Sequence, residues 1–436
     1  MIPVSRRTAL KALTLPVTSG LTGLGAAGCD AGGPALNVAV VWTGWELEQF
    51  QKVIDTFTKN TRIQCHLLSM GDDVNAFLGS EVTSAAQPDV ALVPQPGTVL
   101  SDRGRLVRQS WPSQDAASWR GLLAGPDRAE YGVWYKASYK SMVWHTPAVT
   151  PPRQGWNWHD WKAWCQERAG DHPRPLAIGA ADGWVLADWF SNLLLALCPD
   201  TYQALAGAYH GLSLGHGTAA DAGRYWKDPC VADTLRELGS LWQYPGLFPG
   251  GAERALATQF DQSVLDVFGT GEAMMVAGAD FYWSTITQYT SFPQSEIGWF
   301  PFPRVPPGQN PVITAGDAAV GFSKVGNDLI DWLSSPPALR IWAKQGGFLT
   351  IDGRVRHEDY RYPSSMNTDA LVRNVQSKDA QFNLSDLLSG PLAGSDGEGA
   401  WKIFTDFFAD VAVRGVDLDT ATATAVNALA NGTGGA

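Results

Sequence analysis

The stretch VVWTGWELEQFQKVIDTFTKNTRIQC, Val40 to Cys65, decides the fold class. Its second half places apolar residues at i, i+3, i+4 and i+7, which predicts a helix over Leu47–Lys59 with one buried face. Those residues are Phe50, Val53, Ile54 and Phe57. The apolar run Val38–Val41 before the helix is typical of a buried strand. The segment Trp42–Glu46 is therefore a turn at the carboxyl end of a strand, where open α/β sheets bind ligands.

The same alternation of strand and helix continues along the first third of the chain. Strands are expected over Ile63–Met70 and Val90–Val93, with a helix over Asp73–Ala85 between them. A βαβαβ order implies a parallel sheet, so the loops after its strands meet at one edge. These loops are Trp42–Glu46, Met70–Asp73 and Pro94–Gly97, and their polar and aromatic groups predict a binding rim.

Composition narrows the classes of partner. The chain has 436 residues and a net charge of −11, and its first 28 residues hold three basic residues and no acid, so the rest carries −14. An acidic body argues against nucleic acid or anionic lipid as the main partner. The chain also has 19 tryptophans. These rings either fill the core or offer flat apolar surfaces to the C–H faces of sugars.

The amino terminus has the features of an export signal. Ser5–Lys11 resembles a twin-arginine signal, and residues 1–28 end in small residues directly before Cys29, as in the lipobox of bacterial lipoproteins. Cys29 is then the lipid-modified first residue, and residues 29–36 form a lipid-anchored tether to the cell membrane. The alternative is an ordinary cleaved signal followed by a chance cysteine.

Four cysteines remain, and none lies in a CxxC spacing, which makes a zinc ribbon improbable. They are Cys65, Cys165, Cys198 and Cys230. Outside the cytoplasm they allow three disulfide pairings, and buried free thiols are also compatible with export of a folded protein. No metal site and no cofactor are expected.

The rest of the chain leaves the first domain and returns to it. Tyr131–His145 is expected to be a strand that leads into a helix-rich region after Trp156. Short strands are expected there at 176–179, 273–277 and 297–302, and a Gly- and Ala-rich loop at Gly207–Gly223. A strand over Ala315–Ser323 and a helix over Trp332–Gln345 mark the return, and helices follow from Ala370.

Seven segments then carry a family resemblance. They are VVWTGWELEQFQKVIDTFTKNTRIQ, QPDVALVPQPG, YGVWYKASYKSMVW, AIGAADGWVLADWF, GTGEAMMVAGADF, TAGDAAVGFS and IWAKQGGFL. In this order and spacing, the chain from Asn37 to about Asp410 resembles an ABC transporter solute-binding protein of the carbohydrate group, similar to maltose-binding protein and nearest to α-glucoside binders. The resemblance implies two α/β lobes, at 37–140 with 315–350 and at 141–314 with 351–436, that close by a hinge on a sugar in a central cleft. It also implies a monomer that delivers sugar to membrane permease subunits.

The resemblance further implies which side chains contact the sugar. In this sequence they are Trp45, Glu46, Gln95, Tyr135, Lys136, Asp182, Trp184, Asp280, Phe281, Gly316, Asp317 and Trp401. Carboxylates accept hydrogen bonds from sugar hydroxyls, lysines and amides donate them, and rings supply an apolar floor. Asp280 departs from the family pattern, which has an aromatic residue there, so either Asp280 or Phe281 faces the ligand.

Motifs of several other functions occur in the sequence, but their context does not favour them. Gly211–Gly215 fits the G-x-S-x-G pattern of serine hydrolases, but that motif needs a preceding strand and a helix is expected there. A glycoside hydrolase needs two carboxylates that flank one bond, and Asp182 and Asp188 are 240° apart on a helix. His210 and His216 are weak metal candidates. A lipoprotein that binds sugar for sensing or adhesion remains the main alternative.

Overall fold

The computed structural model describes residues 35–79, 87–95, 97, 100, 103–110, 117–362, 368–377, 379–393 and 399–432. All of them belong to one compact unit. The predicted export signal, and Cys29 with it, lies outside the described residues. No helix in the described ranges is long and apolar enough to cross a membrane.

The first sheet contains the strands of the quoted stretch and has the order β10-β9-β3-β1-β2, with β4 beside β9. Its strands are β1 (Ala35–Val40), β2 (Gln64–Ser69), β3 (Val90–Val93), β4 (Val133–Tyr139), β9 (Ile313–Gly321) and β10 (Gln381–Phe382). β1 is parallel to both β2 and β3, with Val38 opposite Leu67 on one side and Val90 on the other. The predicted parallel βαβαβ unit is therefore confirmed. β9 runs antiparallel to β3 and β4.

The second sheet has the order β6-β7-β5-β8. Its strands are β5 (Met142–His145), β6 (Arg174–Ala177), β7 (Ala273–Gly278) and β8 (Gly298–Pro301). β6 and β7 are parallel, whereas β5 is antiparallel to β7 and β8. We call the region around each sheet a lobe. Only Lys140 and Ser141 separate β4 of the first sheet from β5 of the second, so these two residues form a crossover between the lobes.

The lobe boundaries drawn from the sequence remain a prediction. β10 lies in the range 351–436 that was assigned to the second lobe, yet it pairs with β9 of the first sheet. The segment that follows β10 contacts helices of the second lobe. Residues 381–387 thus form a further connection between the lobes.

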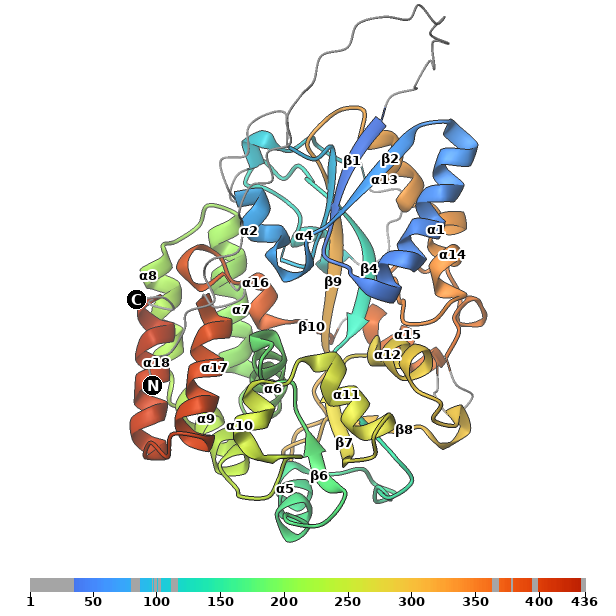
Figure 1. Cartoon of the computed structure of the whole chain (residues 1–436). Coiled ribbons are helices and arrows are strands. Elements are labelled where there is room, and N and C mark those ends of the chain that lie inside the picture. The colour runs from blue at the N-terminus through green and yellow to red at the C-terminus, as the bar shows by residue number, and fades with distance from the viewer. Residues whose placement is uncertain are drawn as a thin grey trace, which may run out of the picture. The chain divides into compact units, whose positions relative to one another are not determined.

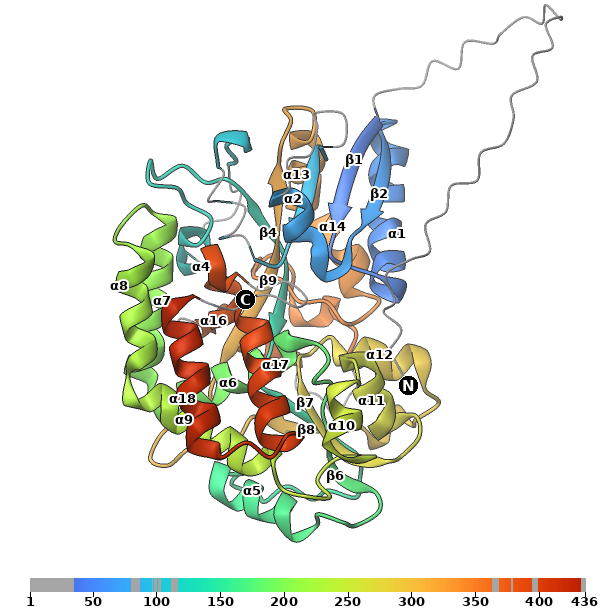
Figure 2. The same cartoon turned by 60° about the vertical axis from the view of Figure 1, so that its left-hand side comes forward.

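Helices surround both sheets (Figures 1 and 2). Their bounds are α1 (Gly44–Thr61), α2 (Val74–Gly79), α4 (Ala117–Gly121), α5 (Trp158–Glu167), α6 (Gly183–Leu197), α7 (Pro199–Ser213), α8 (Ala219–Gly223), α9 (Pro229–Trp242), α10 (Gly251–Leu256), α11 (Phe260–Phe268), α12 (Tyr282–Tyr289), α13 (Asn327–Leu333), α14 (Pro336–Ala343), α15 (Thr368–Gln376), α16 (Leu384–Leu387), α17 (Gly399–Ala412) and α18 (Leu418–Asn431). In both views α1 and α14 lie together beside the first sheet, and α17 and α18 lie together with α9.

Helix α1 has the buried face that its sequence predicts. Phe50, Val53, Ile54 and Phe57 are all buried. The helix ends where Arg62 adopts a left-handed conformation and its N–H bonds the carbonyl of Thr58. Phe50 packs on Trp42 and Trp342, so α1 and α14 share one aromatic core.

Two local predictions were wrong. Gly207–Gly223 is not a loop throughout, because α7 continues to Ser213 and α8 starts at Ala219. The helix predicted over Trp332–Gln345 is two helices, α13 and α14, since Pro336 lacks the N–H that a continuous helix needs and instead begins α14. Of the cysteines, Cys198 and Cys230 form a disulfide, and Cys65 and Cys165 are free thiols.

Candidate ligand-binding site

A cavity of about 440 Å³ is lined by residues of both lobes. Its size is in the usual range for small-molecule sites. The three loops predicted to form a rim all line it, through Thr43, Gly71 and Pro94 among others. The second lobe contributes Trp184, Phe260 and further residues. The parallel strand ends thus form one wall of the cavity, as the sequence predicts.

Strand β4 and the residue directly after it supply polar side chains to this cavity at alternate positions. Lys136, Ser138 and Lys140 all line it, because side chains two residues apart on an extended chain point to the same face. Sequence reasoning found only Lys136. The same period-2 spacing could have identified Ser138 and Lys140.

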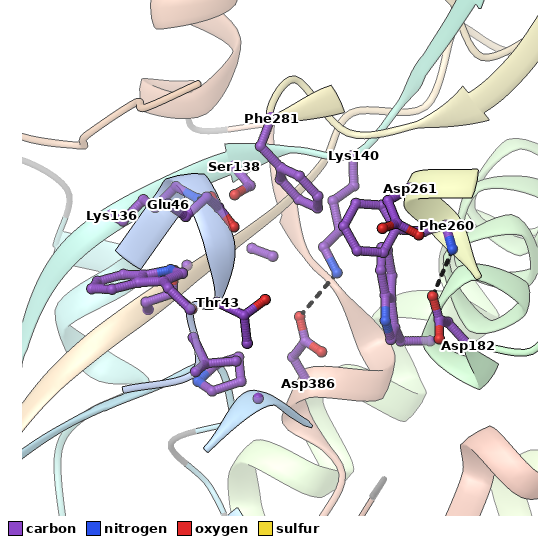
Figure 3. A pocket seen from close by; sticks show the side chains of 18 of the residues that line it. Thr43, Glu46, Lys136, Ser138, Lys140, Asp182, Phe260, Asp261, Phe281 and Asp386 are labelled. Carbon is purple, nitrogen blue, oxygen red and sulfur yellow. Dashed lines mark hydrogen bonds and ion pairs between the residues drawn. The ribbon is translucent and has the colours of Figure 1, made fainter. Parts of the chain in front are cut away.

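Lys136 is the centre of the first charged cluster. It is 3% exposed, and its ammonium group lies 2.5 Å from the carboxylate of Glu46 (Figure 3). Burial lowers the pKa of Lys136, but the charges of Glu46 and Asp317 outweigh burial and hold that pKa above its usual value. Asp317 also accepts a hydrogen bond from the indole of Trp42 at 3.2 Å.

Two carboxylates face this single ammonium group. Burial raises the pKa of Asp317 to about 6 despite the attraction of Lys136, and the negative charge of Glu46 adds to the rise. The cluster is therefore neutral when Asp317 is protonated, and it carries one excess negative charge when Asp317 is ionised.

Lys140 is the centre of a second cluster, which also consists of one lysine and two carboxylates. Its ammonium group donates to Asp188 at 3.1 Å and lies 3.6 Å from Asp386. Asn383 donates from one amide nitrogen to Asp188 at 2.9 Å and to Asp386 at 3.1 Å, so it fixes the two carboxylates relative to each other.

The protonation of the second cluster follows the same logic. Burial lowers the pKa of Lys140, but Asp188 and Asp386 together raise it above its usual value. Burial also raises the pKa of Asp188 to about 7, against the attraction of Lys140 and with a contribution from Asp386. Lys140 and Asp386 line the cavity, whereas Asp188 lies behind them.

Aromatic rings of the second lobe form an apolar wall. Trp184, Phe260 and Phe281 line the cavity, and their ring centroids are 5.3 to 6.1 Å apart. Trp184 is held by close packing of α6 on α17: a Cβ on Gly183 would lie 2.6 Å from the Cβ and carbonyl oxygen of Trp401. Glycine at 183 thus lets the start of α6 approach Trp401 closely.

Trp401 and Asp182 complete this side of the cavity. The indole N–H of Trp401 is buried and has no hydrogen-bond partner among the described residues. A buried donor without a partner costs free energy. Asp182 occupies the N-cap position of α6, but its side chain does not cap that helix. Instead its carboxylate accepts a hydrogen bond from the N–H of Phe260 at 2.7 Å, which joins α6 to α11.

Of the predicted contact residues, eight line the cavity. They are Glu46, Lys136, Asp182, Trp184, Phe281, Gly316, Asp317 and Trp401. Gly316 lies on β9, where a Cβ would come within 2.7 Å of the carbonyl oxygen of Lys136. A side chain at this position would therefore displace the strand that carries the first cluster.

The other four predicted residues do not line the cavity in this structure. Trp45 is half-buried and packs toward Gly347. Gln95 is buried and accepts a hydrogen bond from Asn75 at 2.9 Å. Tyr135 points to the opposite face of β4 from Lys136 and packs in the core against Trp42 and other rings.

Asp280 has a structural position that explains its departure from the family pattern. It is fully buried and accepts hydrogen bonds from the N–H of Tyr139 at 2.8 Å and from the hydroxyl of Tyr362 at 2.7 Å. Burial raises the pKa of Asp280 to about 6, although Tyr362 and Lys136 oppose the rise. Asp280 therefore ties β7 to the crossover, and Phe281 is the neighbour that lines the cavity.

Sequence reasoning missed several lining residues. The largest omissions are Lys140, Phe260 and Asp386. Phe260 and Asp386 lie at helix ends in stretches that no motif marks. Only the fold brings them beside residues of the first lobe.

The competing catalytic arrangements do not fit the geometry. Ser213 of the G-x-S-x-G pattern ends helix α7, so no strand precedes it as a nucleophile elbow requires. Asp182 lines the cavity but Asp188 does not, so the two carboxylates do not flank a common space. In the described ranges no cluster of potential metal ligands occurs.

Comparison with known proteins finds binding proteins that are similar to this chain in sequence or in fold. No protein-family model matches the chain. The osmoprotective compounds-binding protein GgtB of Synechocystis sp. is 25% identical over an alignment of 373 residues, which covers 80% of this chain and 83% of that protein. The bacterial solute receptor AcbH, described with a preference for b-D-galactopyranose, has a TM-score of 0.68 at 14% identity over 90% of this chain and 98% of its own.

Two further solved structures were determined with sugars. The maltotriose binding protein of Thermus thermophilus, bound with maltotriose, has a TM-score of 0.66 at 13% identity and covers 92% of this chain and 100% of its own. RafE of Streptococcus pneumoniae, in complex with raffinose, gives the same TM-score, identity and coverage. The chain therefore has the two-lobed α/β fold of the solute-binding proteins, and the fold class and resemblance predicted from its sequence are confirmed.

Proposed function

We propose that this protein is the extracytoplasmic solute-binding component of an ABC importer and that it binds a sugar or oligosaccharide in the cavity between its lobes. The observation that carries the proposal is the composition of that cavity. Two lysine–carboxylate clusters and a wall of three aromatic rings line one space of about 440 Å³. A sugar has hydroxyls that both donate and accept, and C–H faces that pack on rings, so it fits both kinds of surface.

Delivery by hinge closure follows from where these groups are attached. Glu46 and Asp317 belong to the first lobe, and Trp184 and Phe281 to the second. A ligand that contacts both lobes binds the closed form more tightly and shifts the population toward it. The closed monomer then docks on the permease subunits in the membrane.

The predicted membrane anchor belongs to the same proposal. An importer component needs to stay near its permease, and a lipid on Cys29 followed by the tether at 29–36 keeps it there. The relatives are binding proteins, which favours binding without catalysis in this chain as well. The ligands named for the relatives form the natural set of probes.

Differential scanning fluorimetry of the purified protein tests the proposal. Probes are D-galactose, maltotriose and raffinose at millimolar concentration. A ligand at one hundred times its dissociation constant stabilises the folded state by about 2.7 kcal/mol, which gives a clear rise in melting temperature. The variant Lys136→Gln should lose most of that rise, while Lys162→Gln, whose side chain pairs with Glu237 away from the cavity, should keep it. An unchanged melting temperature with every sugar would refute the assignment.

A further inference from the structure

The second lysine cluster has features of a ligand subsite that the family resemblance does not assign. Lys140 and Asp386 both line the cavity, and Figure 3 shows the ammonium group and the carboxylate directed toward each other there. Among the described residues the ammonium group of Lys140 makes one hydrogen bond, to Asp188. An ammonium group has three N–H donors, so Lys140 retains capacity to bind an oxygen in the cavity.

The two clusters are separated by aromatic surface. The ammonium nitrogen of Lys136 lies 5.1 Å from the centroid of Phe281, and that of Lys140 lies 5.4 Å from the ring of Trp184. The two rings are themselves 6.1 Å apart. Lys136 and Lys140 are four residues apart along an extended strand, which corresponds to about 13 Å between their backbones.

We propose that Lys140 and Asp386 form a second polar subsite, which together with the Lys136–Glu46 subsite selects a ligand of at least two sugar rings over a monosaccharide. This inference rests on the proposed function, because it names the size class of ligand for the same cavity. One pyranose ring that stacks on Phe281 reaches the first cluster. A second ring, linked to the first, lies over Trp184 and reaches Lys140.

Two buried residues outside the cavity hold the side chains of the second subsite in position. Asp188 and Asn383 do not line the cavity, yet both bond directly to members of the subsite. Asn383 donates a hydrogen bond to Asp386, and Lys140 donates one to Asp188. Asp386 and Lys140 are therefore already ordered before a ligand binds. Such preorganisation reduces the entropy lost on binding. Asp188 and Asn383 are therefore positioning residues.

Isothermal titration calorimetry with D-galactose, maltotriose and raffinose tests this inference. The unaltered protein should bind the better of the two longer sugars at least about tenfold more tightly than galactose, since it adds a charge-assisted hydrogen bond and a ring contact. Lys140→Gln and Asp386→Asn should each weaken binding of the longer sugar by roughly tenfold to a hundredfold. Both variants should weaken binding of galactose less than binding of the longer sugar, because galactose fills the Lys136 subsite alone.

The controls separate this inference from the proposed function and from misfolding. Lys136→Gln should weaken binding of both size classes, and Lys162→Gln should weaken neither. Thermal melts without sugar verify that each variant folds. If Lys140→Gln does not fold, Asp386→Asn tests the second subsite instead, because this variant keeps the hydrogen bond between Lys140 and Asp188. Galactose affinity equal to that of the longer sugars, or equal losses for both classes in Asp386→Asn, overturns the second subsite alone. Absence of binding by all three sugars overturns the proposed function and the subsite with it.

Discussion

We expect Asp317 to make the proposed sugar binding dependent on pH. Burial raises the pKa of this cavity-lining carboxyl to about 6, whereas Lys136 beside it stays protonated because its own pKa is raised. A sugar hydroxyl donates more strongly to an ionised carboxylate than to a neutral acid. Ligand therefore favours the ionised form of Asp317, and a proton must leave before tight binding occurs.

The size of the effect follows from the pKa. At pH 7.5 nearly all of the sugar-free protein has Asp317 ionised, and at pH 5 about one molecule in eleven does. With the neutral form binding about tenfold more weakly, the apparent dissociation constant should rise about fivefold between these values. Asp317→Asn presents an uncharged amide at every pH. It should bind about tenfold more weakly at pH 7.5, because a neutral hydrogen bond replaces a charge-assisted one. Its affinity should change less between pH 7.5 and 5 than that of the unaltered protein.

Calorimetric titration of the best-binding sugar at half-unit steps from pH 5 to 7.5 measures both proteins. Circular dichroism at pH 5 controls for loss of structure, and Asp280 is a useful comparison because its pKa is also raised to about 6 although it does not line the cavity. A flat profile for the unaltered protein refutes the role of Asp317. A profile for Asp317→Asn that is as steep as that of the unaltered protein shows that another group is responsible.

Four further outcomes are expected. For Asp188, whose pKa is raised to about 7 by burial, the folded state holds a proton that the unfolded chain releases near pH 3.9, so the free energy of unfolding should fall as pH rises from 4 to 7, by up to about 4 kcal/mol. Asp188→Asn should reduce this slope in urea unfolding measured across that range, and an equal slope in the variant would contradict the reasoning. Trp401→Phe puts a smaller ring on the cavity wall, so sugar affinity should fall severalfold with little change in the ligand-free melting temperature; an unaffected affinity would assign Trp401 to packing alone. Small-angle scattering should show a smaller radius of gyration with saturating sugar, and an unchanged radius argues against hinge closure. Cys29→Ala should release the protein from the membrane fraction, whereas an unmodified amino terminus at another residue in intact-mass analysis rules out the lipid anchor.

Local sequence determined the first half of the cavity. The helix periodicity of Phe50 to Phe57 and the apolar strand before it predict the βαβ unit, and the parallel order predicts that the loops after β1, β2 and β3 meet. These are short-range consequences of side-chain period and of chain direction in a parallel sheet. The three loops of the rim were predicted in this way, whereas Glu46 within the first of them was implied by the family resemblance.

Only the tertiary structure decided which groups meet across the cavity. Asn383 bonds Asp188 across 195 residues of sequence, and Trp42 bonds Asp317 across 275. No local periodicity encodes such contacts, because they depend on how two sheets and the connections between them are packed. The same packing buries Asp280 behind Phe281 and places Lys140 beside Asp386. It also raises the pKa of Asp188 and of Asp317. The free energy of ionising a carboxyl depends on its burial and on the charges around it, and the residue type alone specifies neither.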